Sequence, residues 1–270
     1  MKLEYFTMEL GLRGKVAMVA AASKGLGYGI ARELAREGAL VSIGSRNETD
    51  IFDAAETLAE ETGSEVLANV LDAASVDSIA KWVENTTETF GGVEMLVVNA
   101  GGPPAGIFDD FTDSEWQDAF ELTLLSSVRM IRAVLPFMRQ EGGGSILTIT
   151  SCSVKEPIDF LLLSNVMRSG VTSLAKSLSL QLASESIRVN NLMPGRIDTD
   201  RVRTLDQMNA DVRNMSATEI KVANELGIPL GRYGTIEEFG KIGAFLLSDA
   251  ASYITGQTIA ADGGTIKTVW

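Results

Sequence analysis

Short apolar runs and amphipathic stretches alternate along most of the chain. The apolar runs have the length of strands and contain few polar residues, which is typical of parallel strands buried on both faces. The stretches between them repeat apolar residues at helical spacing, as Leu26, Ile30 and Leu34 do. The predicted strands are Val16–Ala20, Leu40–Ile43, Glu65–Val70, Met95–Val98, Ser145–Thr150, Arg188–Leu192 and Thr258–Ala260, and the predicted helices are Leu26–Glu37, Asp50–Glu61, Ser75–Phe90, Glu115–Arg139, Leu161–Ala183 and Ile236–Leu247.

The alternation predicts an α/β fold, with a doubly wound parallel sheet of about seven strands between two layers of helices. Residues 1–13 precede the first strand, and we expect an N-terminal extension with little packing there. Residues 14–270 are expected to form a single domain. Residues 201–227 interrupt the alternation with a long polar stretch, so we expect a helical lid over a substrate site.

Composition and charge exclude several classes of protein. The net charge of −13 over 270 residues argues against nucleic-acid binding, because phosphates repel an acidic surface. No apolar run is long enough to span a bilayer, and Met1–Leu10 lacks an apolar signal core, so we expect a cytoplasmic protein without membrane contact. The chain has one cysteine and no histidine, which excludes a Ser-His-Asp triad and histidine-based metal sites. We expect no metal.

A glycine-containing loop joins the first predicted strand to the helix that follows. It reads Ser23, Lys24, Gly25, Leu26 and Gly27 and runs directly into the helical stretch. Glycines at such a turn let the backbone approach a pyrophosphate, while the helix N-terminus supplies amide donors and the positive end of its dipole. The same residues also fit a tight strand-to-helix turn without a ligand.

Further motifs stand at the carboxyl ends of four later strands, where open α/β sheets bind ligands. They are Asn99-Ala100-Gly101, Ser151, Pro194-Gly195-x-Ile197-x-Thr199 and Asp262-Gly263-Gly264. Together with the glycine loop, these motifs resemble the short-chain dehydrogenase/reductase (SDR) family from about Leu12 to Gly264. The resemblance implies that residues 14–270 are a Rossmann-type dinucleotide-binding and catalytic domain. It also implies oxidoreductase activity on a small carbonyl or alcohol substrate.

The resemblance further implies a role for each matching position. The cofactor positions are Ser23–Gly27 for the pyrophosphate, Asn69 and Val70 for adenine, Asn99, Ala100 and Gly101 for the adenosine ribose, and the segment from Pro194 and Gly195 to Ile197 and Thr199 for the nicotinamide carboxamide. Ser151 matches the serine that donates a hydrogen bond to the substrate carbonyl.

The end of the second strand distinguishes between the two nicotinamide cofactors. An acidic residue there would accept the ribose 2′-hydroxyl of NAD and repel a 2′-phosphate, but the sequence reads Ser45-Arg46. Arg46 and Lys24 are both placed to pair with a phosphate through strong, charge-assisted hydrogen bonds. We therefore predict NADP(H) in preference to NAD(H). In the alternative, Arg46 is a solvated residue that stacks on adenine.

Three departures from the family pattern affect the predicted chemistry. The family has Tyr-x-x-x-Lys where this chain has Ser164 and Arg168, the asparagine that positions the proton-relay water falls at Thr123, and the first loop glycine falls at Ala21. We expect Ala21 to be a mild change. Ser164 is a poorer acid than tyrosine, whose pKa is about 10. Arg168 can hold the nicotinamide ribose, but it stays charged and cannot relay a proton. The predicted catalytic residues are Ser151, Ser164 and Arg168.

Three interpretations of the departures remain open. In the first, Ser151, Ser164 and a water chain near Arg168 handle the proton. In the second, another group donates it, with Lys155 the best placed. The other candidate donors are Glu156, Asp159 and Tyr233. In the third, redox chemistry is lost and the chain is a non-redox enzyme or a cofactor-binding regulatory or structural protein. The retained nicotinamide motifs favour the first two.

Other polar residues near the predicted site allow further hypotheses. Arg196, Arg201 and Arg203 either attract a carboxylate-bearing substrate or are solvated surface residues. Cys152 has no histidine partner, so we expect an inert thiol. The resemblance also implies a homotetramer, or a homodimer, packed through the helices Glu115–Arg139 and Leu161–Ala183 and the C-terminal strand.

Overall fold

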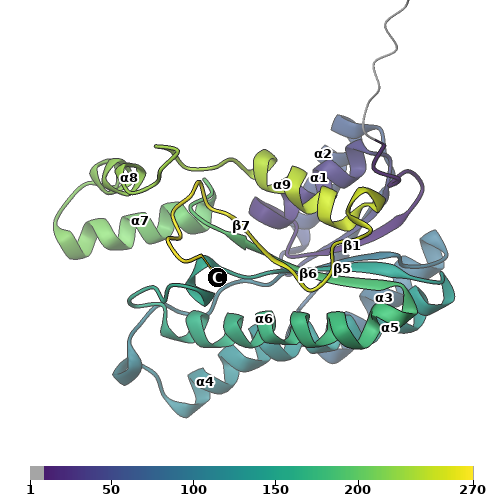
Figure 1. Ribbon diagram of the computed structural model, residues 1–270, viewed down its shortest axis with the longest axis horizontal. Helices are drawn as coiled ribbons and strands as arrows, with labels where there is room; N and C mark the ends of the chain where they lie inside the picture. The colour runs from purple at the N-terminus through teal and green to yellow at the C-terminus, as the bar shows by residue number, and fades with distance from the viewer. Residues whose placement is uncertain (1–8, 270) are drawn as a thin grey trace, which may run out of the picture.

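A single parallel sheet with helices on both faces forms the body of the protein (Figure 1). The computed structural model describes residues 9–269. The strand order is β3-β2-β1-β4-β5-β6-β7, so the chain starts in the middle of the sheet, moves to one edge and then to the other. The strands are β1 (Val16–Ala20), β2 (Leu40–Ser45), β3 (Val66–Val70), β4 (Met95–Val98), β5 (Gly144–Ile149), β6 (Ile187–Pro194) and β7 (Thr258–Ala261). The predicted doubly wound α/β fold is confirmed.

Each face of the sheet has its own hydrophobic core. On one face pack α1 (Gly25–Arg36), α2 (Glu48–Thr62) and α9 (Ile236–Leu247). On the other face pack α3 (Val76–Phe90), α5 (Ser126–Gln140) and α6 (Leu162–Leu182). The strands are buried on both sides, which explains why their sequences are apolar runs instead of alternating patterns. All strand ends that carry the predicted motifs meet at one edge of the sheet.

The predicted helix Glu115–Arg139 is interrupted near its middle. It consists of α4 (Asp113–Ala119), a π-helical turn at Phe120–Leu125, and α5. The hydroxyl of Ser126 donates to the carbonyl oxygen of Leu122 at 2.5 Å, and that of Ser127 donates to Thr123 at 2.8 Å. Hydroxyls that bond to carbonyls of the preceding turn compete with the regular backbone pattern. Hydrophobic spacing does not reveal such a turn, which is common at functional positions.

The segment before β1 packs more tightly than we expected. Residues 1–8 of the expected extension lie outside the described residues. Leu12 is only 1% exposed and belongs to the core on the α1 side. The carbonyl oxygen of Leu10 accepts a hydrogen bond from the amide of Asp249 at 3.0 Å. The expectation of little packing up to residue 13 is therefore wrong for residues 10–12, because an apolar residue there completes the core below α9.

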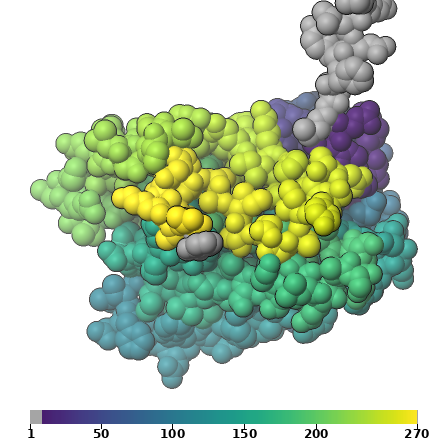
Figure 2. Space-filling view, in the orientation of Figure 1, coloured from purple at the N-terminus to yellow at the C-terminus, as the bar shows by residue number. Residues whose placement is uncertain are grey.

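The stretch 201–227 is helical, as expected. It forms α7 (Asp200–Arg213) and α8 (Ala217–Leu226), which project beyond the sheet at the end where β6 finishes. The C-terminal residues after β7 lie between this helix pair and the body of the protein (Figure 2). Whether α7 and α8 close over a substrate stays a prediction. Within residues 9–269, no helix has both the length and the apolar character needed to cross a membrane.

Candidate functional site

The loop between β1 and α1 leaves the first turn of α1 open to an anion. Lys24 precedes the helix without a side-chain hydrogen bond to it, and the first turn holds no acidic residue. Gly25 has a φ of 66°, and a Cβ on Gly27 would lie 2.5 Å from the carbonyl oxygen of Ala21. Side chains cap the N-termini of α2, α3, α7, α8 and α9 instead. The residues Ser23–Gly27 therefore have the free amides and close backbone approach that a pyrophosphate site needs.

Ala21 is a larger change than we expected from its size. Its φ of 50° places it in the left-handed region, which costs a residue with a Cβ roughly 1–2 kcal/mol. The carbonyl oxygen of Ala21 accepts a hydrogen bond from Nδ2 of Asn99 at 3.4 Å. This contact joins the phosphate loop to the end of β4, so a strained residue stands at the centre of the expected cofactor site.

The end of β2 lies against the phosphate loop. The hydroxyls of Ser23 and Ser45 are 3.1 Å apart, and Arg46 follows as an exposed residue. Nζ of Lys24 is 3.4 Å from a carboxylate oxygen of Asp200, with both side chains at least 60% exposed. Exposed ion pairs of this kind contribute little to stability, so the ammonium of Lys24 can leave Asp200 and pair with a phosphate instead. Lys24 and Arg46, which we predicted to pair with the 2′-phosphate, are thus both located at the loop between β1 and α1.

The two residues expected near adenine differ in what they offer. Val70 is half exposed at the end of β3. Asn69 is buried, and its side-chain amide is bonded to Ser42 at 3.2 Å and to Asn85 at 3.0 Å. The structure therefore directs the Asn69 side chain into the core below α3, and of this pair only Val70 is exposed for contact with a ligand.

The end of β6 has a free donor and a free acceptor on one residue. Around Ile197, the amide of Asp198 donates to Gly234 and the amide of Gly234 donates to Arg196. The N–H and C=O of Ile197 itself have no partner within residues 9–269. One donor beside one acceptor is what a carboxamide group needs. Nearby, Thr199 caps α7 by accepting a hydrogen bond from the amide of Val202. The other two residues of the motif belong to the end of the sheet. Pro194 is the last residue of β6, and the amide of Gly195 donates to Ala261 of β7.

Ser164 and Arg168 contact each other on the first turns of α6. Nε of Arg168 donates to the hydroxyl oxygen of Ser164 at 3.2 Å, and Nη1 donates to the carbonyl oxygen of Ile149 at 3.1 Å. Ile149 ends β5, two residues before Ser151, so the guanidinium links α6 to the strand end that carries Ser151. The hydroxyl of Ser151 accepts a hydrogen bond from the amide of Ser153 at 3.1 Å. The hydrogen of the Ser151 hydroxyl remains free to donate.

The Arg168 guanidinium is a fixed positive charge at this site. Burial lowers its pKa to about 10, with a further contribution from the positive charge of Arg201. The group therefore remains protonated at neutral pH and can stabilise negative charge without supplying a proton. Thr123, predicted to stand where the family has an asparagine, lies in the π-helical turn with its hydroxyl buried and unpartnered within residues 9–269.

The alternative proton donors are placed differently from one another. Tyr233 is 6% exposed, and its hydroxyl donates to Asp206 at 2.8 Å. Burial and this contact raise the pKa of Tyr233 to about 12. Glu156 accepts a hydrogen bond from the amide of Lys267, on the C-terminal segment. The Tyr233 hydroxyl is thus bonded to α7, whereas the Lys155 side chain forms no hydrogen bond or ion pair within residues 9–269.

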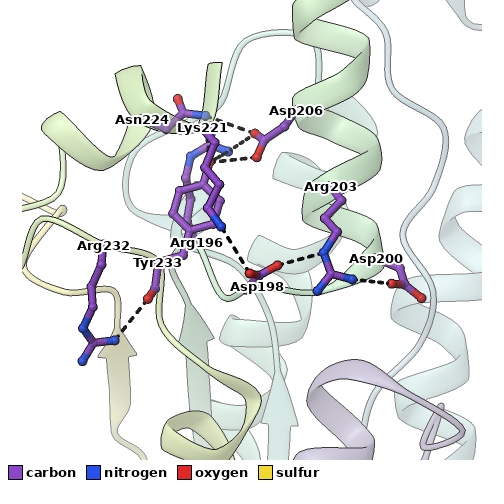
Figure 3. A network of polar contacts seen from close by, with 9 residues as sticks. All are labelled: Arg196, Asp198, Asp200, Arg203, Asp206, Lys221, Asn224, Arg232 and Tyr233. Carbon is purple, nitrogen blue, oxygen red and sulfur yellow. Dashed lines mark hydrogen bonds and ion pairs between the residues drawn. The ribbon is translucent and has the colours of Figure 1, made fainter. Parts of the chain in front are cut away.

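Asp206 joins α7 and α8 to the body of the protein, although no sequence motif marks it (Figure 3). Its carboxylate is buried and receives hydrogen bonds from Arg196 at 2.8 Å, Tyr233 at 2.8 Å and Asn224 at 3.1 Å. These partners lie 10, 27 and 18 positions away along the chain. Sequence spacing does not reveal such a group.

The three arginines that we considered as carboxylate binders differ in their partners within and around this network. Figure 3 shows Arg203 between Asp198 and Asp200, and both contacts are 2.9 Å. Arg196 is paired with Asp206. Arg201 instead donates to the carbonyl oxygen of Pro103 at 3.3 Å and forms no ion pair within the described residues. Arg201 alone of the three is left without a carboxylate. Asp198 and Asp200 both form ion pairs with Arg203, and Asp198 forms a second one with Lys221.

Cys152 is expected to react with iodoacetamide at pH 8 at least about 100-fold more slowly than free cysteine. Burial, with the charges of Asp262 and Glu156, raises the pKa of its thiol to about 12, so very little thiolate is present. Its Sγ also lies 3.0 Å from the carbonyl oxygen of Pro194. Mass spectrometry of the intact protein follows the reaction, because the chain has one cysteine. The same protein in concentrated urea should react as an ordinary thiol, and equal rates in both states would contradict the expectation.

Comparison with known proteins identifies the family. A family described as "Enoyl-(Acyl carrier protein) reductase" matches residues 20–265. The cattle (Bos taurus) protein "Dehydrogenase/reductase SDR family member 4" is 34% identical over 257 residues, covering 95% of this chain and 88% of its own. This chain belongs to the SDR family. The replacement of the family's first loop glycine and Tyr-x-x-x-Lys pair by Ala21, Ser164 and Arg168 stays a prediction.

Solved SDR structures share the whole fold. An L-sorbose reductase from Gluconobacter frateurii, complexed with NADPH and L-sorbose, superimposes with a TM-score of 0.92 at 30% identity and covers 97% of this chain and 100% of its own. An actinorhodin polyketide ketoreductase with NADPH gives a TM-score of 0.90 at 30% identity, covering 94% and 98%. Both resemble this SDR chain over nearly its full length.

Proposed function

We propose that this SDR protein is an NADP(H)-dependent oxidoreductase that interconverts a carbonyl and an alcohol. The observation that carries the proposal is the placement of the hydroxyl and guanidinium groups of Ser164 and Arg168 beside the strand end of Ser151. The same sheet edge holds the phosphate loop and the free backbone groups of Ile197. A site for a nicotinamide cofactor and a site that can stabilise an oxyanion thus lie together.

Two independent observations support NADP(H) as the cofactor. Solved relatives of this chain are complexes with NADPH. In this chain, Lys24 and Arg46 flank the loop where the adenosine ribose would lie, and β2 ends without an acidic residue. A 2′-phosphate would accept charge-assisted hydrogen bonds from both cations, while NAD(H) would leave them unused.

The residues of the chain divide the reaction between them. When bound, NADPH supplies the hydride. Ser151 donates a hydrogen bond to the carbonyl oxygen and orients it. Arg168 holds the nicotinamide ribose and keeps a positive charge close to the oxygen, where negative charge develops as the carbonyl is reduced. This stabilisation requires no proton from the guanidinium.

The hydroxyl of Ser164 takes part in delivering the proton. Its oxygen already accepts a hydrogen bond from Arg168, so its own hydrogen is free to point elsewhere. A hydroxyl that accepts from a cation becomes a stronger donor, because hydrogen bonds in a chain polarise one another. A water molecule held by such a hydroxyl can pass a proton to the alkoxide. Lys155 is the alternative donor, since its ammonium forms no hydrogen bond or ion pair with the residues that the structure describes.

Cofactor titration and turnover test the proposal together. We expect NADPH to quench the protein's tryptophan fluorescence with a Kd at least 10-fold lower than that of NADH, and to be oxidised in the presence of a carbonyl panel. A protein that binds NADPH but reduces no carbonyl would be the non-redox alternative. In that case Ser164→Tyr combined with Arg168→Lys should create reductase activity. Equal affinity for both cofactors would contradict the assignment of Lys24 and Arg46.

We also propose assembly into a homotetramer or homodimer through α5, α6 and β7. On α6, Leu180 is 73% exposed and Val166 is 46% exposed. Burying these two side chains against another chain would remove apolar surface from water.

A further inference from the structure

Two guanidinium groups on different helices lie near the proposed site. Arg168 lies on α6, and Arg201 lies on the first turn of α7. Arg168 is held in place by Ser164 and Ile149, and Arg201 by Pro103. Neither arginine forms an ion pair within residues 9–269. Two like charges close together repel each other, and a bound anion would relieve this repulsion.

The loop after β4 connects the two arginines. A Cβ on Gly102 would lie 3.2 Å from Nη2 of Arg201, so that guanidinium rests on the residue that follows the Asn99-Ala100-Gly101 motif. Farther along the same loop, the amide of Gly106 donates to the carbonyl oxygen of Phe160 at 2.6 Å, just before α6. The loop therefore lies between α7 and the helix that carries Ser164 and Arg168. The positive charge of Arg201 also lowers the pKa of Arg168, so the two guanidinium groups are close enough to interact electrostatically.

The acidic residues near α7 do not neutralise Arg201. Asp198 and Asp200 are paired with Arg203, and Asp206 is paired with Arg196. A chain with a net charge of −13 has many carboxylates available, yet the ones nearest this arginine are bound to other cations. The structure thus leaves the positive charge of Arg201 without a carboxylate partner in the part of the chain that it describes, although the chain as a whole is acidic.

We propose that Arg201 binds a carboxylate of the substrate, so that the physiological substrates are oxo acids, or the matching hydroxy acids. This inference rests on the proposed function. The carbonyl would lie at Ser151 and Arg168, and the carboxylate would accept hydrogen bonds from Arg201 next to the glycine- and proline-rich loop. An arginine fork fits a carboxylate through two parallel hydrogen bonds, which gives orientation as well as affinity.

Paired substrates and one pair of variants test this proposal. Pyruvate, acetoacetate and levulinate place the carboxylate at increasing distance from the carbonyl, and each is compared with its methyl ester. We expect at least one acid to be reduced with a kcat/KM roughly 10- to 100-fold above that of its ester, the range of a charge-assisted hydrogen bond. Arg201→Gln should remove this preference by raising KM for the acid. Arg203→Gln is the matched control, because Arg203 lies on the same helix and already has its carboxylates.

Two further measurements separate this proposal from the proposed function. The Kd of NADPH should be unchanged in Arg201→Gln, and an increase of 10-fold or more would overturn the proposal by assigning Arg201 to the cofactor. Ligand-observed NMR measures succinate binding to the protein with NADP⁺ present, without any turnover. If no carbonyl compound is reduced but succinate binds and Arg201→Gln abolishes the binding, the carboxylate site stands and the proposed function fails. Esters reduced as well as acids, or succinate binding that is independent of Arg201, would overturn the carboxylate site alone.

Discussion

Arg168→Gln is expected to lower kcat/KM for every carbonyl substrate by about 10³-fold. Glutamine keeps a polar side chain on α6 but removes the positive charge that faces the developing oxyanion. Because the guanidinium is largely shielded from water, which lowers its pKa to about 10, its charge is poorly screened and acts strongly on the reacting oxygen. Steady-state kinetics with NADPH held at saturation measure the effect as a fall in kcat.

The controls for this variant separate catalysis from folding and from cofactor binding. Lys81→Gln removes an equal charge from an exposed position on α3, outside the proposed interface, and should leave kcat/KM within about twofold. Circular dichroism should give the same spectrum for both variants and the parent. Arg168→Gln affects acids and esters alike, whereas Arg201→Gln affects acids alone. A parent enzyme that is active and an Arg168→Gln variant that keeps more than a third of its kcat/KM would exclude the electrostatic role.

The fold could be predicted from local sequence because each element carries its own signal. Strands buried on both faces are continuous apolar runs, and helices on one face repeat their apolar residues every three to four positions. The phosphate loop is also local, since Gly25 and Gly27 lie within one turn of each other. Their conformations in the structure, a left-handed φ and a close approach to Ala21, are those that the loop motif requires.

Features that depend on distant partners could not be predicted in the same way. The difference between Arg201 and its neighbours Arg196 and Arg203 arises from which carboxylates lie close in space. Asp206 gathers donors from α8 and from the segment before α9. The strain at Ala21 is a backbone property that its small side chain conceals. In each case the deciding contact joins residues that no sequence spacing connects.

The cofactor preference gives the second large expected effect. Replacing both Lys24 and Arg46 by glutamate should raise the Kd of NADPH roughly 30- to 1,000-fold, as each lost charge-assisted hydrogen bond is replaced by repulsion. The Kd of NADH should change less than about fivefold, because NADH lacks the 2′-phosphate that both cations would face. The Lys24–Asp200 pair does not oppose this effect, since both side chains are exposed. Fluorescence titration of both cofactors measures the change.

A matched double variant makes the interpretation specific to position. Lys81→Glu with Arg13→Glu produces the same change in net charge at two exposed residues, one on α3 and one before β1, at the opposite end of that strand from the phosphate loop. If the preference for NADPH came from the overall charge of this acidic chain, both double variants would weaken NADPH binding equally. If it comes from Lys24 and Arg46, only the first will, and the parent's preference will also fall as salt is added or as the pH drops through about 6, where the phosphate loses its second negative charge.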